Sequence, residues 1–96
     1  MRLQFRPEAR LDILEARQWY ESRSAGLGSE FARAVDAASA VILRFPASNP
    51  QVRGDVRKAI LRRFPYSLLY VASQDAITVL ACFHHRRDPR TWDDRV

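Results

Sequence analysis

The spacing of apolar residues changes period along the chain, and this change predicts its secondary structure. Residues 1–6 alternate apolar and polar side chains, a pattern typical of a short strand with one apolar face. Apolar residues then recur every three or four positions over residues 7–22 and again over residues 29–45, as on one face of a helix. Pro7 suits a first helical turn and Pro46 ends the second helix. The pattern predicts a strand followed by two helices.

In the second half of the chain the period falls to two. Residues 46–55 are rich in turn-forming residues and predict a loop. The alternating segment at 56–64 and the segments at 66–72 and 76–84, rich in strand-forming residues, predict three strands, with a hairpin turn at 73–75. In the last strand, strict alternation puts four residues on each face, Ile77, Val79, Ala81 and Phe83 against Thr78, Leu80, Cys82 and His84.

The order of these elements predicts the fold class. Two helices joined across the glycine-containing break at residues 24–28 form an antiparallel hairpin. Short connections make the last three strands an antiparallel meander, whose apolar face the helix hairpin covers. The first strand is expected at an edge of the sheet. We therefore predict one α+β domain over residues 1–96, with a helix hairpin on a mostly antiparallel sheet.

Composition indicates the cellular compartment of this domain. The longest stretch without a charged side chain, residues 64–74, is far too short to span a membrane, and no apolar leader is visible at the N-terminus. Cys82 is the only cysteine, which excludes an internal disulfide and favours a reducing compartment. We expect a cytoplasmic protein.

Positive charge is concentrated in the second half of the chain. The chain carries 16 basic and 11 acidic residues, a net charge of +5, and residues 47–96 hold nine of the basic and five of the acidic ones. Such a basic half suits an anionic partner, either nucleic acid or an acidic protein segment. Ordinary solubilising charge would give the same balance.

Basic side chains gather around two of the predicted strands, and they are the main candidates for function. They are Arg57, Lys58, Arg62 and Arg63 on or beside the first meander strand, and His84, His85, Arg86, Arg87 and Arg90 after the last. Two interpretations are open. A docking surface would contact a target, without catalytic residues, through Arg62, Arg63, His84, Arg86, Arg87 and Trp92. A metal-independent ribonuclease would instead use a histidine, His84 or His85, as acid or base, with Arg62 and Arg87 stabilising the phosphate beside His84.

Other chemistries are weakly represented in the sequence. His84 and His85 are adjacent, so on a strand they point to opposite faces and do not readily hold one ion. Asp88, Asp93 and Asp94 lack the spacing of a calcium loop, and no glycine-rich phosphate loop is present. Cys82 lies among apolar residues, as a buried thiol does. We expect no metal and no cofactor. Trp92 either packs onto the core or anchors an interface.

Several short motifs, in order along nearly the whole chain, match a known family. They are Glu8-Ala9, Asp12-Ile13, Trp19-Tyr20-Glu21, Gly26-Leu27-Gly28 with Phe31, Arg57-Lys58-Ala59, Arg62-Arg63-Phe64-Pro65-Tyr66, Leu69-Tyr70 and the ending His84-x-x-Arg87-Asp88-Pro89-x-x-Trp92. In these motifs the chain resembles the ParE toxins of type II toxin–antitoxin systems, within the RelE/ParE superfamily of plasmid-stabilisation proteins.

The resemblance implies a growth-inhibiting toxin that a ParD-like or other antitoxin, encoded beside it, binds and neutralises. ParE-like toxins act on DNA gyrase, whereas the RelE-like branch cleaves mRNA on the ribosome with a C-terminal His, Arg or Tyr. This chain has no tyrosine after Tyr70, which departs from several of those ribonucleases. An acidic antitoxin segment would lie along the helix hairpin or extend a sheet edge. A nucleic-acid-binding module without effect on growth is a third interpretation.

Overall fold

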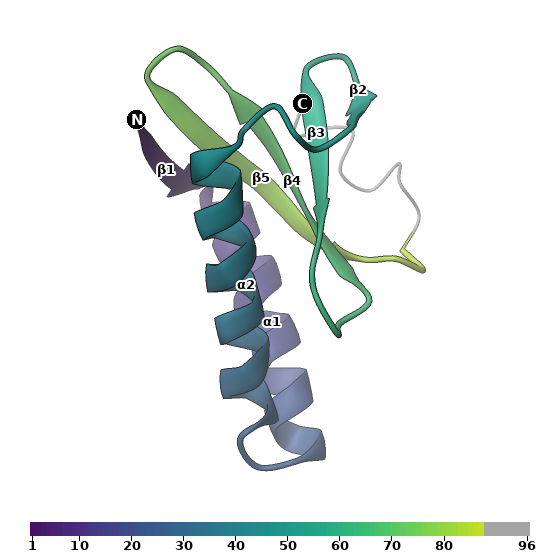
Figure 1. Cartoon of the computed structure of the whole chain (residues 1–96). Helices are drawn as coiled ribbons and strands as arrows, with labels where there is room; N and C mark the ends of the chain where they lie inside the picture. The colour runs from purple at the N-terminus through teal and green to yellow at the C-terminus, as the bar shows by residue number, and fades with distance from the viewer. Residues whose placement is uncertain (88–96) are drawn as a thin grey trace.

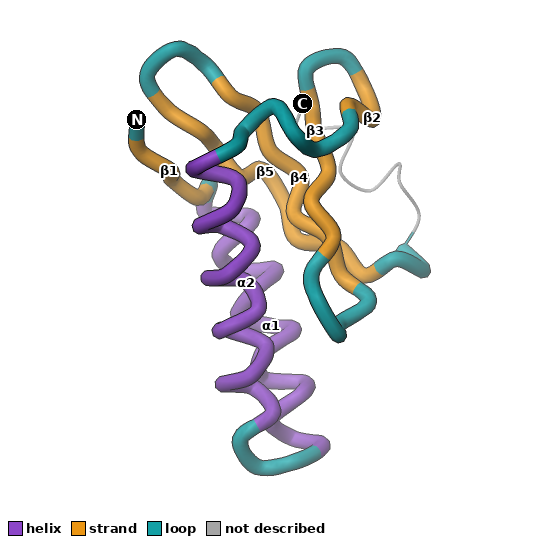
Figure 2. The backbone as a smooth tube through the Cα atoms, viewed as in Figure 1, coloured by secondary structure: helices purple, strands orange, loops and turns teal. Residues whose placement is uncertain are grey.

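The computed structural model describes residues 1–87, which form a helix hairpin and a five-stranded sheet (Figure 1). Its elements, in chain order, are β1 (Arg2–Phe5), α1 (Pro7–Arg23), α2 (Leu27–Arg44), β2 (Gln51–Arg53), β3 (Val56–Ile60), β4 (Tyr66–Ala72) and β5 (Ala76–His84). The helices cover one face of the sheet (Figure 2). The predicted α+β class and the predicted order of helices and meander are confirmed.

The strands lie in the order β1-β5-β4-β3-β2, with β1 parallel to β5 and all other pairs antiparallel. β1 is therefore an edge strand, as predicted. The predicted loop at residues 46–55 contains a strand that the sequence pattern missed. This strand, β2, pairs with β3, and Gln51 lies opposite Arg57. All three residues of β2 are exposed, so no alternation of buried and exposed positions marks it.

The two helices are held together at their turn by Glu21. Its carboxylate accepts hydrogen bonds from the backbone N–H of Gly26 (2.9 Å) and of Gly28 (3.0 Å). Gly26 takes a left-handed φ of 89°, which lets α2 begin at Leu27, slightly earlier than predicted. A Cβ on Gly28 would lie 2.8 Å from the Arg17 carbonyl oxygen, so the close approach of the helices needs glycine there. Within the described residues, neither helix is long and apolar enough to cross a membrane.

The main core lies between the helix hairpin and the sheet. It contains a group of aromatic rings from both helices, the β3–β4 loop and the start of β4, with centroids 4.9 to 6.0 Å apart: Tyr20, Phe31, Phe64 and Tyr66. A second cluster of buried apolar residues lies on the opposite face of the sheet and comprises Val56, Leu69, Leu80, Ala81 and Phe83.

The predicted alternation of β5 is wrong because the strand contains a bulge. Leu69 pairs with Ala81 but Tyr70 pairs with Val79, which leaves Leu80 as an extra residue. One extra residue reverses the facing of everything that follows. Ile77 and Val79 share the face toward the helices, whereas Ala81 and Phe83, predicted on that same face, join the cluster on the opposite face.

The first meander strand is shorter than predicted. β3 ends at Ile60, and residues 61–65 form a loop in which Arg63 has a left-handed φ of 67°. Leu61 and Phe64 are buried in this loop, so their apolar character mimicked a continuing strand. Arg62 and Arg63 therefore project from a loop rather than from the sheet.

Candidate functional site

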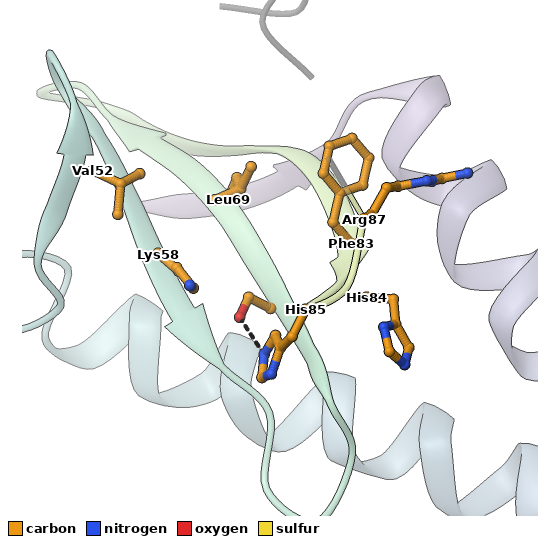
Figure 3. Close-up of a pocket in the computed structure, with 8 residues that line it drawn as sticks. Val52, Lys58, Leu69, Phe83, His84, His85 and Arg87 are labelled. Carbon is orange, nitrogen blue, oxygen red and sulfur yellow. Dashed lines mark hydrogen bonds between the residues drawn. The ribbon is translucent and has the colours of Figure 1, made fainter. Parts of the chain in front are cut away.

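A hollow on the sheet face away from the helices carries several basic side chains, and we call it the cationic cleft (Figure 3). Its volume is about 250 Å³. Residues of β2, β3, β4, β5 and the following turn line it, namely Val52, Lys58, Ser67, Leu69, Phe83, His84, His85 and Arg87.

Strand pairing explains why these side chains meet. Lys58 on β3 lies directly opposite Leu69 on β4, and Ser67 on β4 lies opposite Phe83 on β5. Directly paired residues point to the same face of a sheet. The bulge at Leu80 turns Phe83 to this face, so the irregularity in β5 builds one wall of the cleft.

His85 is held at the cleft by two hydrogen bonds. Its Nε2 lies 2.9 Å from the hydroxyl oxygen of Ser67, a side chain only 3% exposed. Its backbone N–H donates to the Pro65 carbonyl (2.8 Å). Figure 3 shows the Lys58 side chain extending toward this histidine. The cleft thus brings the Lys58 ammonium group toward the His85 imidazole.

His84 points to the other side of the sheet, as the adjacency of the two histidines predicts. Its ring meets the Tyr66 ring edge-on, with centroids 5.1 Å apart. Its Nδ1 accepts the backbone N–H of Arg86 (3.0 Å), so the proton of the neutral ring lies on Nε2. The His84 carbonyl accepts the N–H of Arg87 (3.0 Å), which closes the turn after β5.

Arg87 borders hollows on both sides of the sheet. Its guanidinium lies 5.2 Å from the centroid of the Phe83 ring, within cation–π range. It also borders a second hollow beside α1, together with Asp12 and Tyr66. Burial raises the pKa of Tyr66, and the nearby Arg87 charge partly opposes that rise. Lysine, arginine and imidazole donors in one cleft suit an anionic group such as a phosphate or a carboxylate.

The residues that the sequence analysis proposed for target contact or catalysis lie in separate places in the structure. His84 and Arg87 both line the cationic cleft. Arg86 is exposed in the adjoining turn. Arg62 and Arg63 line a different hollow, beside α2, and neither lines the cationic cleft. Trp92, with Asp88, Arg90, Asp93 and Asp94, lies outside the described residues.

Among the polar residues of the cleft, the sequence analysis did not name Ser67, listed Lys58 only with the basic candidates, and offered His85 only as an alternative to His84. Lys58 was grouped with the basic residues, but strict alternation could not show that it shares a face with Phe83. Ser67 is the polar residue at the start of an otherwise apolar strand, and that contrast is the signal that would have found it.

Cys82 is buried, as predicted. Burial raises the pKa of its thiol to about 12, with a further contribution from the Asp12 carboxylate, so the thiol is protonated at neutral pH and is a poor nucleophile. Asp12 Oδ2 also accepts the backbone N–H of Cys82 (3.0 Å). Among residues 1–87, no three histidine, cysteine or carboxylate side chains gather as metal ligands.

The fold and the cleft together show what kind of protein this is. It is a small basic α+β domain, in which a helix hairpin covers one sheet face and cationic side chains gather on the other.

Comparisons with known proteins place this fold. No family model and no curated protein sequence matches the chain. Among solved structures, a chain of the "Chromosomal ParDE TA system from P. aeruginosa" has a TM-score of 0.64 at 18% identity, covering 88% of this chain and 95% of that chain. A chain of the RelBE2 toxin–antitoxin complex from Mycobacterium tuberculosis has a TM-score of 0.59 at 22% identity, covering 85% and 87%. The RelE/ParE-like fold expected from the sequence is confirmed.

Proposed function

We propose that this protein is the toxin of a type II toxin–antitoxin system, and that it stops growth by binding DNA gyrase. The observation that carries this proposal is the fold shared with a chain of a ParDE system, which extends over 88% of this chain. The ParE-like motifs of the sequence support the same branch. An antitoxin encoded beside the gene neutralises the protein.

The cationic cleft is the proposed contact with the target. Lys58 and Arg87 supply positive charge, His84 and Arg86 border the same end of the sheet, and Trp92 follows in the chain. No carboxylate is among the described residues that line the cleft, so its field favours an anionic surface. Binding alone is sufficient for this role, and none of these residues needs to react.

A second candidate function is cleavage of mRNA on the ribosome. The observation that favours it is that His84 and Arg87 together line the hollow beside α1, on the side of the sheet to which the His84 ring points. His84 would transfer the proton and Arg87 would stabilise the phosphate. Arg62, the third residue of the original nuclease hypothesis, lies beside α2 and not in this hollow.

Induction in bacteria, with amino-acid incorporation measured over the first minutes, separates the two functions. Gyrase inhibition predicts continued protein synthesis while growth later fails, and the purified protein then inhibits supercoiling by gyrase. Immediate arrest of protein synthesis contradicts gyrase as the target and favours the nuclease. Normal growth with salt-sensitive nucleic-acid binding contradicts both and supports a simple binding module.

Two arginine variants connect the result to the cleft. Arg87→Ala should abolish the effect on growth. Arg2→Ala removes the same charge from β1, where Arg2 pairs with Ala76 at the opposite end of β5, and should leave the effect unchanged. Equal loss in both variants would indicate a general dependence on net charge and contradict the cleft as the contact.

A further inference from the structure

The two helices enclose a groove along the outer side of the hairpin, and we call it the seam groove. Its volume is about 540 Å³, and residues of β1, α1 and α2 line it, among them Arg10, Leu14, Arg17, Ala32 and Asp36. The hairpin residues that pack toward the sheet, such as Ala9 and Phe31, are fully buried, whereas the charged residues of the groove are exposed. The seam groove shares no lining residue with the cationic cleft.

The floor of the seam groove is apolar, and one of its walls offers a large apolar side chain to solvent. Ile13 and Val35 lie in the floor and pack into the main core. Leu14, on the α1 wall, is 49% exposed. Ala32, on the α2 wall, has only a methyl group as its side chain. An exposed leucine on one helix and a gap on the other suit the packing of a further pair of helices, ridge into groove.

The two walls of the seam groove carry opposite charges. Arg10 and Arg17 belong to the α1 wall, and Asp36 belongs to the α2 wall. None of the three forms an ion pair with any of residues 1–87. Arg10 donates a long hydrogen bond (3.4 Å) to the Phe5 carbonyl, which keeps its side chain near the groove. Both signs of charge are therefore available to a partner on this surface.

Arg10 and Asp36 lie at the same level of the hairpin. Gly28 of α2 abuts the Arg17 carbonyl of α1, since a Cβ there would lie 2.8 Å from that oxygen. The helices are antiparallel, so about two turns from this contact the chain reaches Arg10 on α1 and Asp36 on α2. These two side chains therefore face each other across the groove.

A second copy of this chain complements this arrangement. A two-fold axis along the seam would place α1 of each copy over α2 of the other, at the same level. Arg10 of each copy would then face Asp36 of the other, and Leu14 of each would enter the gap at Ala32. A wholly acidic partner would meet Asp36 with like charge, and a wholly basic partner would do so at Arg10 and Arg17.

We propose that two copies of this chain associate through the seam groove as a two-fold dimer. Dimer formation does not depend on the proposed function. Both cationic clefts stay uncovered in the dimer, because each lies on the sheet face away from its hairpin. The net charge of +5 on each copy opposes association. Burial of Leu14 and the two Arg10–Asp36 pairs offset this repulsion.

Sedimentation velocity measures the dimer on the full chain, made by cell-free synthesis, over a series of concentrations. Leu14→Asp should weaken dimerisation at least about tenfold, because it places a charge in the apolar contact. Leu11→Asp is the matched control and should dimerise as the unchanged chain does, since Leu11 is similarly exposed (55%) on α1 and does not line the groove. Circular dichroism checks that each variant is folded.

Charge reversal tests the two-fold arrangement itself. Arg10→Glu and Asp36→Arg should each dimerise at least about tenfold more weakly alone, because like charges then meet across the interface. Mixed in equal amounts, the two variants should form a heterodimer, since the new glutamate of one faces the new arginine of the other and the second, natural pair is intact. Arg17 is left unchanged because its charge also acts on Glu21, which holds the turn between the helices.

Three results would overturn this dimer. The first is an unchanged chain that stays monomeric at every concentration. The second is a dimer that Leu14→Asp weakens no more than Leu11→Asp does, and the third is a pair of charge variants that stay monomeric when mixed. If the unchanged chain is monomeric and Leu14→Asp instead weakens binding of the product of the adjoining gene, the seam groove belongs to that partner and the dimer is wrong.

Discussion

Tyr70, buried in the main core, links the sheet to the connection between α2 and β2. Its hydroxyl donates to the Pro46 carbonyl (2.7 Å) and accepts from Asn49 Nδ2 (3.2 Å). Arg57 donates to the carbonyl of the same asparagine (2.6 Å). A connection rich in turn-forming residues is thus anchored by polar atoms of two strands.

Tyr70→Phe should lower the free energy of unfolding by about 1–2 kcal/mol, because a buried hydrogen-bonded hydroxyl is lost and its partners lose a bond. Chemical denaturation measures the change. Tyr20→Phe is the control, since the Tyr20 hydroxyl forms no hydrogen bond with any of residues 1–87 and its ring lies in the same core. An equal loss in both variants would show that the hydrogen bonds of Tyr70 contribute nothing specific.

At the scale of elements, side chains replace backbone partners where strands and helices end. β1 stops at Phe5, opposite Val79, and from there the edge of β5 faces α1. Asp12 on α1 takes over as hydrogen-bond acceptor for the Cys82 N–H. Glu21 does the same for the amides at the start of α2. Carboxylates on α1 therefore position both the sheet and the second helix.

Asp12→Ala should cost about 1–3 kcal/mol of stability, because the Cys82 amide loses its acceptor in a partly buried place. Asp12→Asn keeps an oxygen at the same position and should recover most of the loss. Denaturation gives the free energies, and amide hydrogen exchange at Cys82 locates the effect. Unchanged exchange at Cys82 in Asp12→Ala would contradict this role.

Glu21 should make the helix hairpin sensitive to acid. Hydrogen bonds from Gly26 and Gly28 hold the pKa of this carboxyl below its ordinary value of 4.5 in the folded protein. A depressed folded-state pKa adds stability above the ordinary pKa, and this contribution is lost as the pH falls through the folded-state pKa.

Glu21→Gln should therefore lower the Tm at neutral pH, and the difference from the unchanged protein should narrow in acid. Thermal melting across this pH range measures it. Glu15→Gln, an exposed carboxyl on the same helix, serves as the control and should show no such narrowing. A Tm difference for Glu21→Gln that is independent of pH would contradict the role of its charge.

At the scale of the whole molecule, the two candidate interaction surfaces lie on different sides of one sheet. The cationic cleft is on the open face, and the hollow lined by Arg62 and Arg63 is beside α2. The net charge of +5 favours association with anionic partners at both.

Arg87→Ala and Trp92→Ala should each abolish growth inhibition while the chain stays folded and still binds the product of the adjoining gene. Arg87 lines the cleft, whereas the case for Trp92 rests on the sequence, since this residue lies outside the described part. Growth after induction and calorimetry with the adjoining product measure the two properties. Full toxicity in both variants would mean that the target contact is elsewhere.

Much of the fold was predictable because its signals are local. The spacing of Phe31, Val35 and Ile42 indicates a helix, and all three are buried where that spacing predicts. The strand-forming residues of the segment that became β4 and the turn at residues 73–75 likewise predicted a hairpin that the strand pairing confirms. Of the candidate site, the sequence analysis assigned roles to His84 and Arg87, listed Lys58 and His85 among the basic candidates, and missed Ser67.

By itself, the sequence determined the two helices, the meander, the edge position of β1 and the surplus of positive charge. The charge follows from composition alone. The helices, the meander and the edge position of β1 depend on the period of apolar residues and on short connections, which act between residues close in the sequence. The tertiary structure alone decided the bulge at Leu80, the short strand β2 and the loop that carries Arg62 and Arg63. These depend on which strands pair and where their neighbours end, so only the folded sheet determines which basic side chains share the cationic cleft.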